Sequence, residues 1–244
     1  MTLSTGVDVS TGDYGRDADT EVISVPMSVR VSHDRWSVRV SVPYLTITGP
    51  ADVADIVVGD GGVSEGDAGG AVTRTGTVRG LGDTTIAVTR NFRHVGPREG
   101  YLDITGRVRL PTGDEEDGLG VGVTDYALAT EYGISGREGG GYVGVGRRFL
   151  SDRGTMDRND GWQLNLGAWR YLGRRTTLGV DGYWRESSFE GGEDPAEVGG
   201  YVAHRFNENW RATASLNAGL SDASPDLNFG VRVSWRSRIS NDRD

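Results

Sequence analysis

The sequence predicts an all-β protein, a transmembrane antiparallel up-and-down β-barrel of about 12 strands, on three observations. Segments of about ten residues alternate apolar and polar side chains along most of the chain. The connections alternate between tight turns and long, often acidic loops. Aromatic residues gather near strand ends, where the headgroups of a bilayer would lie. We expect one barrel domain over residues 1–236 and a polar C-terminal tail over residues 237–244.

The composition is compatible with this fold without requiring it. The 244 residues include 39 glycines and no cysteine, and the net charge of -9 argues against nucleic-acid binding. The mean hydropathy of -0.43 would ordinarily indicate a soluble protein. That inference does not hold for a barrel, whose lipid-facing surface uses only alternate residues. Since no signal peptide opens the chain, we expect a mature sequence with an added initiating Met.

The clearest hairpin spans residues 23–44. A two-residue turn at His33 and Asp34 would give one apolar face along both arms and one face with arginines. Because proline cannot donate to a ladder, we expect Pro26 and Pro43 at a bulge or a break in pairing. The predicted pairs are Ser32 with Arg35, Val31 with Trp36, Arg30 with Ser37, Val29 with Val38, Ser28 with Arg39, Met27 with Val40 and Pro26 with Ser41.

The remaining strands follow from the same alternation. Residues 51–79, rich in Gly, Asp and Ser, are most simply a long loop. With an even strand count, both termini should lie at the end that carries the short turns, which is the periplasmic end in an outer-membrane barrel. The other expected strands cover residues 3–10, 85–89, 102–110, 125–132, 142–149, 163–168, 177–184, 196–202, 210–221 and 227–236.

Several motifs resemble one family of proteobacterial outer-membrane proteins, labelled as phenol meta-pathway degradation proteins or as transporters. The resemblance extends over about residues 5–236 and implies a barrel in the outer membrane of a Gram-negative bacterium. The label suggests uptake of small aromatic compounds. Barrels of this kind usually finish on an aromatic residue that the insertion machinery reads, but here RSRISNDRD follows Trp235. Either the signal is internal at Trp235, or the tail is an added segment or a periplasmic extension. The motifs are STGDYG at 10–15, VPMSVRV at 25–31, RWSVRVSVPYLTITGP at 35–50, GLGD at 80–83, LPTGD at 110–114, TDYAL at 124–128 and GLSDASPD at 219–226.

Charged residues opposite the apolar faces predict a polar lumen. An arginine facing lipid at the midplane would cost about 2–4 kcal/mol, so these side chains should point inward. We expect a channel in which arginines oppose carboxylates and orient polar or anionic solutes. The alternative is a non-conducting structural or adhesion barrel, in which the charges pair locally as a polar core. The candidate solute-path residues are Arg30, Arg39, Asp103, Arg107, Arg109, Asp125, Glu131, Asp181, Glu197, Arg211 and Arg232.

Seven aromatic residues predict two girdles at headgroup level. The girdle residues are Trp36, Trp210 and Trp235 at the short-turn ends of strands, and Tyr44, Tyr126, Trp162 and Trp184 at the opposite ends.

We expect four kinds of partner: outer-membrane lipid, lipopolysaccharide, a small-molecule solute and the barrel-insertion machinery. We expect no nucleic acid as a partner, and we expect the protein to be a monomer.

Other chemistries have weaker support. A membrane-embedded hydrolase would need a His beside a Ser and an acid, and neither His33, His94 nor His204 shares an inward face with such partners. The acidic residues 114–117, together with those at 152–160, are either a divalent-cation bridge to lipopolysaccharide or a solvated loop. We expect no catalytic residue, no metal site and no cofactor.

Overall fold

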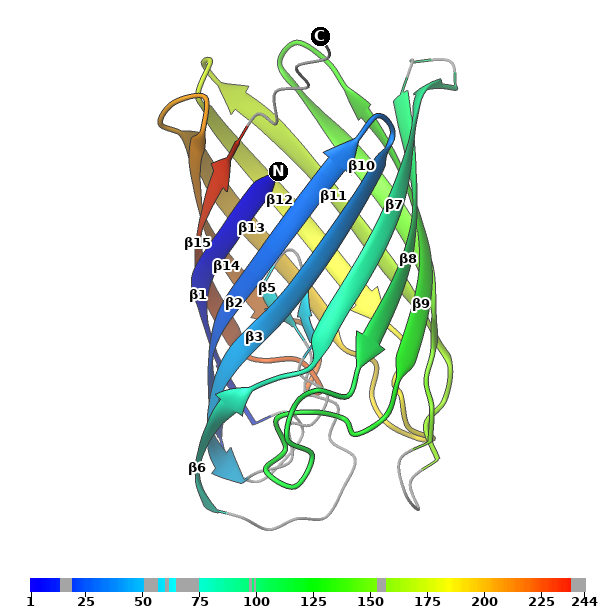
Figure 1. Ribbon diagram of the computed structural model, residues 1–244, viewed down its shortest axis with the longest axis vertical. Helices are drawn as coiled ribbons and strands as arrows, with labels where there is room; N and C mark the ends of the chain where they lie inside the picture. Colours follow the sequence, from blue (N-terminus) through cyan, green and yellow to red (C-terminus); the bar gives the residue numbers. More distant parts are fainter. Residues whose placement is uncertain are drawn as a thin grey trace, which may run out of the picture.

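Twelve antiparallel strands close into a barrel in the computed structural model, which describes residues 1–13, 19–50, 57–59, 62–64, 75–96, 98, 100–152 and 157–237 (Figure 1). The ring closes because β2 pairs with β1 on one side and with β3 on the other. The predicted fold class is therefore confirmed. Within the described residues, no helix has the length and apolarity needed to cross a membrane. The barrel strands are β1 (Thr2–Gly12), β2 (Thr20–His33), β3 (Trp36–Pro50), β7 (Thr84–Val95), β8 (Gly100–Leu110), β9 (Asp125–Ser135), β10 (Gly139–Phe149), β11 (Gly161–Leu172), β12 (Thr176–Arg185), β13 (Ala196–Arg205), β14 (Trp210–Gly219) and β15 (Leu227–Arg236).

The two ends of the barrel differ as the sequence predicts. Short turns join β2 to β3, β9 to β10, β11 to β12 and β13 to β14 at one end, and the start of β1 and the end of β15 lie there (Figure 1). The amino group of Met1 donates to the carbonyl of Ser237 at 3.1 Å, which ties the first strand to the last. The longer connections lie at the other end. We call these the short-turn end and the loop end.

The outward face is apolar on every barrel strand. Leu166 and Val180 are each 59% exposed, and Val29, Val40, Leu128 and Phe229 are exposed in the same way. Such a continuous exposed apolar surface is unfavourable in contact with water and favourable in contact with the hydrocarbon core of a bilayer. The barrel therefore has the surface of a membrane protein.

The β2–β3 hairpin differs from the predicted register by two residues. Its turn has Asp34 and Arg35 at the centre, and Asp34 adopts a φ of 52°, which aspartate tolerates better than most residues. Arg30 consequently pairs with Arg39 rather than with Ser37. The predicted pairs were wrong, but a shift of two residues leaves every side chain on its predicted face.

Pro26 and Pro43 lie where neighbouring ladders are interrupted. They oppose each other in an unbroken β2–β3 ladder, as the shifted register requires. On the far side of β2, pairing with β1 is interrupted opposite Pro26. On the far side of β3, pairing passes from β7 to β6 (Thr75–Leu81), and the Gly82 N–H donates to the Pro43 carbonyl at 2.8 Å. The expected break therefore occurs on one side of each proline, whereas the ladder that joins the two prolines is regular.

Residues 51–79 contain short strands, whereas the sequence predicted one long loop there. Strand β6 continues the line of β7 and lengthens the sheet beside β3 beyond the barrel rim. Strands β4 (Val57–Gly59) and β5 (Gly62–Ser64) pair with each other, and β5 lies against β15 and β1 inside the barrel (Figure 1). The rest of this stretch lies outside the described residues.

A small hydrophobic core forms at the loop end, on the inner face of β2, β3 and β6. Val22, Leu45 and Ile47 are buried there against Leu119 of the β8–β9 loop. Asp83 fixes that loop, because its carboxylate accepts the N–H of Gly113 at 3.0 Å and that of Val121 at 2.9 Å. The GLGD and LPTGD motifs, distant in sequence, therefore meet at Asp83.

Candidate functional site

The barrel encloses a cavity of about 1130 Å³ whose lining includes many charged and hydroxyl side chains. Its wall comes mostly from β2, β3 and β7 to β13, and the side of the lumen where β5 lies contributes little. Nine of the eleven predicted solute-path residues line it. They are Arg30, Arg39, Asp103, Arg107, Arg109, Asp125, Glu131, Asp181 and Glu197.

Arg211 and Arg232 do not line the cavity. Arg232 lies on β15, 3.7 Å from the carboxylate of Asp8 on β1, on the side where β5 is packed. Arg211 lies at the start of β14, opposite Arg205 at the short-turn end. Strand parity placed both on the inner face, but it does not reveal that β5 occupies the lumen beside Arg232 or that Arg211 lies at the rim.

Four arginines of the cavity wall share a single row of the sheet. Residues directly opposite one another run from Arg30 to Arg39, then to Ala87, Arg107, Ala127 and Arg148, across six successive strands. We call this set the arginine row. Because the strands tilt, the row climbs from the short-turn end at Arg30 to the loop end at Arg148. No carboxylate interrupts it.

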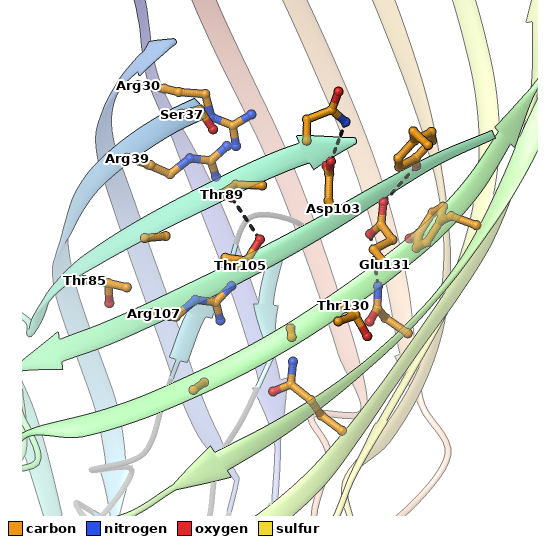
Figure 2. Close-up of a pocket in the computed structure, with 18 of the residues that line it drawn as sticks. Arg30, Ser37, Arg39, Thr85, Thr89, Asp103, Thr105, Arg107, Thr130 and Glu131 are labelled. Carbon is orange, nitrogen blue, oxygen red and sulfur yellow. Dashed lines mark hydrogen bonds between the residues drawn. The ribbon is translucent and has the colours of Figure 1, made fainter. Parts of the chain in front are cut away.

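The surroundings of Arg107 leave its guanidinium accessible from the lumen. Its cross-strand neighbours are the small side chains of Ala87 and Ala127. Within the described chain, Arg107 makes no hydrogen bond and no ion pair. Figure 2 shows Arg30, Arg39 and Arg107 along one wall of the cavity. The hydroxyl side chains beside them are Ser37, Thr85, Thr89 and Thr105.

Three of the five predicted lumen carboxylates share a different row, two inward positions further along the strands. Asp103 opposes Glu131, and the row continues through Gly144, Asn165 and Tyr183 to Glu197. Neutral donors bind two of these acids. Asn91 donates to Asp103, the Tyr101 hydroxyl donates to Glu131 at 2.8 Å, and Asn165 donates to Glu131 at 3.4 Å (Figure 2).

Glycines let the lumen tyrosines lie flat against the wall. A Cβ on Gly133 would lie 2.4 Å from the ring of Tyr101, and one on Gly167 would lie 2.5 Å from the ring of Tyr142. Tyr201 covers Gly179 in the same way. Each pair is directly cross-strand, so the ring occupies the space that a side chain would fill. This arrangement keeps large rings out of the centre of the lumen.

Asp125 forms a buried ionic cluster at the loop end. It accepts hydrogen bonds from Arg109 on β8, from Arg158 at 3.1 Å and from the Ser151 N–H at 3.0 Å. The side chains of Arg158 and Asp125 are only 2% and 6% exposed. Asp125 therefore attaches the β10–β11 loop to the barrel wall.

Sequence reasoning missed the buried arginines of the loop end. Arg148 and Arg185 both donate to the Ser188 hydroxyl at 3.2 Å, which holds the β12–β13 loop at the mouth. The sequence did contain a signal for Arg148, because its position alternates with those of the outward-facing Val143 and Val145 on β10, which predicts that Arg148 faces inward. The loop residue Arg158 had none, since periodicity does not extend into loops.

The predicted girdle residues lie on the outward face. Trp36, Tyr44, Tyr126, Trp162 and Trp210 are exposed, and Trp184 and Trp235 are half-buried beside other outward residues. Outward arginines occur at the same levels. The Arg90 guanidinium lies 4.8 Å from the ring centroid of Trp36, and that of Arg147 lies 5.2 Å from Trp162. Such arginine–aromatic pairs suit a membrane–water interface.

The histidines and the acidic loop form no recognisable reactive site. His33 lies in the exposed turn beside Asp34, and His204 bonds to Thr176 at 3.0 Å while its ring packs on Phe206. Among the described residues, no group of three or more His, Cys, Asp or Glu side chains has the geometry of a metal site. The Asp114 carboxylate instead accepts the backbone N–H groups of residues 116 and 117.

Comparisons with known proteins show a similar fold. No protein-family model matches the sequence, and no curated protein matches it significantly. The COG4313 outer membrane channel from Pseudomonas putida F1 is similar with a TM-score of 0.69 and 14% identity, over 96% of this chain and 94% of that chain. The NanC porin has a TM-score of 0.62 and 7% identity, over 96% and 100% of the two chains. The KdgM porin has a TM-score of 0.59 and 7% identity, over 98% and 100%.

These likenesses concern the fold, since the identities are low. They place the chain among barrels of the kind found in outer-membrane channels and porins. The family resemblance noticed in the sequence is supported at that level, whereas the phenol meta-pathway label stays a prediction.

Proposed function

We propose that the chain is a passive channel for small solutes in the outer membrane of a Gram-negative bacterium. The observation that carries this proposal is the cavity of about 1130 Å³, lined with charged and hydroxyl side chains inside an apolar outer surface. A polar interior within a lipid-facing barrel is typical of a water-filled pathway. The similar solved structures, a channel and two porins, support the same class.

The solute path would run between the short-turn and loop ends, past the nine cavity-lining charged residues named above, and the accessible ones among them, such as Arg107, would contact the solute. The two aromatic girdles would place the barrel in lipid, with lipopolysaccharide at the loop end. We expect a monomer that the barrel-insertion machinery assembles, and no catalytic activity. Small aromatic solutes are the class that the sequence resemblance suggests.

Planar-bilayer recording tests the proposal directly. The purified protein should need detergent, change its gel mobility on heating and produce discrete conductance steps. Absence of conductance above the lipid background, from protein that shows the heat-dependent mobility shift, would contradict the channel.

A non-conducting structural barrel is the second candidate, and one observation favours it. At the loop end, the side chains of Val121, Arg185 and Ser188 are almost completely buried, because the loops pack into the mouth. Such packing narrows the entrance from that side. The same recording separates the two candidates.

A further inference from the structure

We propose that the arginine row is the path of anionic solutes through the lumen and that Arg107 is the residue that selects for them. This inference rests on the proposed channel function and specifies its substrate class, namely small carboxylates and other oxyanions. Arginine suits this class, because its planar guanidinium presents several N–H donors in the geometry that a carboxylate accepts.

The geometry of the row supports a stepwise path. Arg39 and Arg107 are separated by one strand that carries Ala87, and Arg107 and Arg148 by one that carries Ala127. With neighbouring strands about 4.8 Å apart, successive guanidinium-bearing positions lie about 10 Å apart. Two arginine side chains at that spacing, such as those of Arg39 and Arg107, are long enough to approach the same ion. Conduction requires several weak sites of this kind rather than one tight site.

The environment of the row also favours anions over cations. Hydroxyl groups of Ser37, Thr85 and Thr105 lie beside the row and supply further donors. Of the lumen acids on β8 and β9, Asp125 is bound by Arg109 and Arg158, and Asp103 and Glu131 accept hydrogen bonds from neutral side chains. The positive charge of Arg107 therefore stays directed at the solute.

The central position of Arg107 makes it the most informative residue to change. Arg30 lies near the short-turn mouth, and Arg148 is held at the loop end by Ser188 and by the carbonyl of Glu186. Arg107 lies between these two ends with alanines on both sides. Its replacement should interrupt the row without disturbing a bonded partner.

Reversal potentials test the inference, measured first in a potassium chloride gradient and then in a sodium acetate gradient. The wild-type channel should prefer anions, and Arg107→Gln should lower the anion-to-cation permeability ratio by about threefold, because the potential along a narrow pore depends on each lining charge. Arg107→Lys should retain most of the preference. The matched control is Arg170→Gln, which removes an arginine whose side chain is 73% exposed and faces Glu138 outside the lumen.

The outcomes separate this inference from the channel function. If Arg107→Gln fails to fold, Arg39→Gln provides the same test at the next arginine of the row. A conducting wild-type channel that prefers cations, or whose selectivity is unchanged by loss of Arg107 or Arg39, would overturn the inference and leave the channel intact. A folded but silent wild-type protein would overturn both.

Discussion

Two arginines on the same face of β8 have opposite environments. Arg109 opposes Asp125 and is bonded to it, whereas Arg107, two residues earlier, lies between Ala87 and Ala127 and has no bonded partner in the described chain. The local sequence, RVRL at 107–110, does not distinguish them. What differs is the cross-strand neighbour, so the sheet register assigns one arginine to stability and leaves the other for the solute.

The contrast extends to whole regions of the lumen. At the loop end, Asp125 and Asp83 bind loop segments, and the charges there serve to hold the mouth in shape. Along the arginine row, the cross-strand neighbours of Arg107 are alanines rather than acids. Changes in the first region should therefore affect stability, and changes in the second should affect selectivity.

The largest effect is expected for Asp125→Asn. The change leaves Arg109 and Arg158 without their charged acceptor in a buried site, and breaking such a pair typically lowers the free energy of unfolding by about 3–5 kcal/mol. Denaturant unfolding in lipid vesicles measures it. Glu138→Gln, which removes an ion pair with both side chains largely exposed, should have no measurable effect. Equal stability of the two variants would show that the cluster is not structural.

The inward orientation of these charges could be predicted from sequence, but their pairing could not. Alternation along each strand fixes the face, and a shift of two residues preserves it. The predicted hairpin register opposed Arg30 to Ser37, and in that register the first step of the arginine row does not exist. The turn at Asp34 and Arg35 sets the true register, and a four-residue polar stretch allows more than one turn position. The partners of Asp125 and Asp83 come from loops, where no periodicity guides prediction.

A smaller effect is expected for Asp83→Ala. The backbone N–H groups of Gly113 and Val121 lose their acceptor. A hydrogen bond to a charged group contributes about 1.5–3 kcal/mol to the free energy of unfolding when water cannot replace it. The loop end is partly solvated, so we expect the lower part of that range. Faster hydrogen exchange of these two amides would report the loss. Glu116→Gln in the same loop serves as the control, and unchanged exchange in Asp83→Ala would show that Leu119 alone holds the loop.

The smallest effect on stability, and the sharpest test of the contrast, is expected for Ala127→Asp. This change gives Arg107 an acid directly opposite, as Asp125 is to Arg109, and the new acid also faces Arg148. The anion preference should fall about as far as in Arg107→Gln, because a paired guanidinium no longer presents its charge to the solute. Ala129→Asp is the matched control, since it adds the same charge to the lumen opposite Thr105 and Gly146. If both variants lowered the preference equally, the net charge of the lumen, and not the arginine row, would determine selectivity.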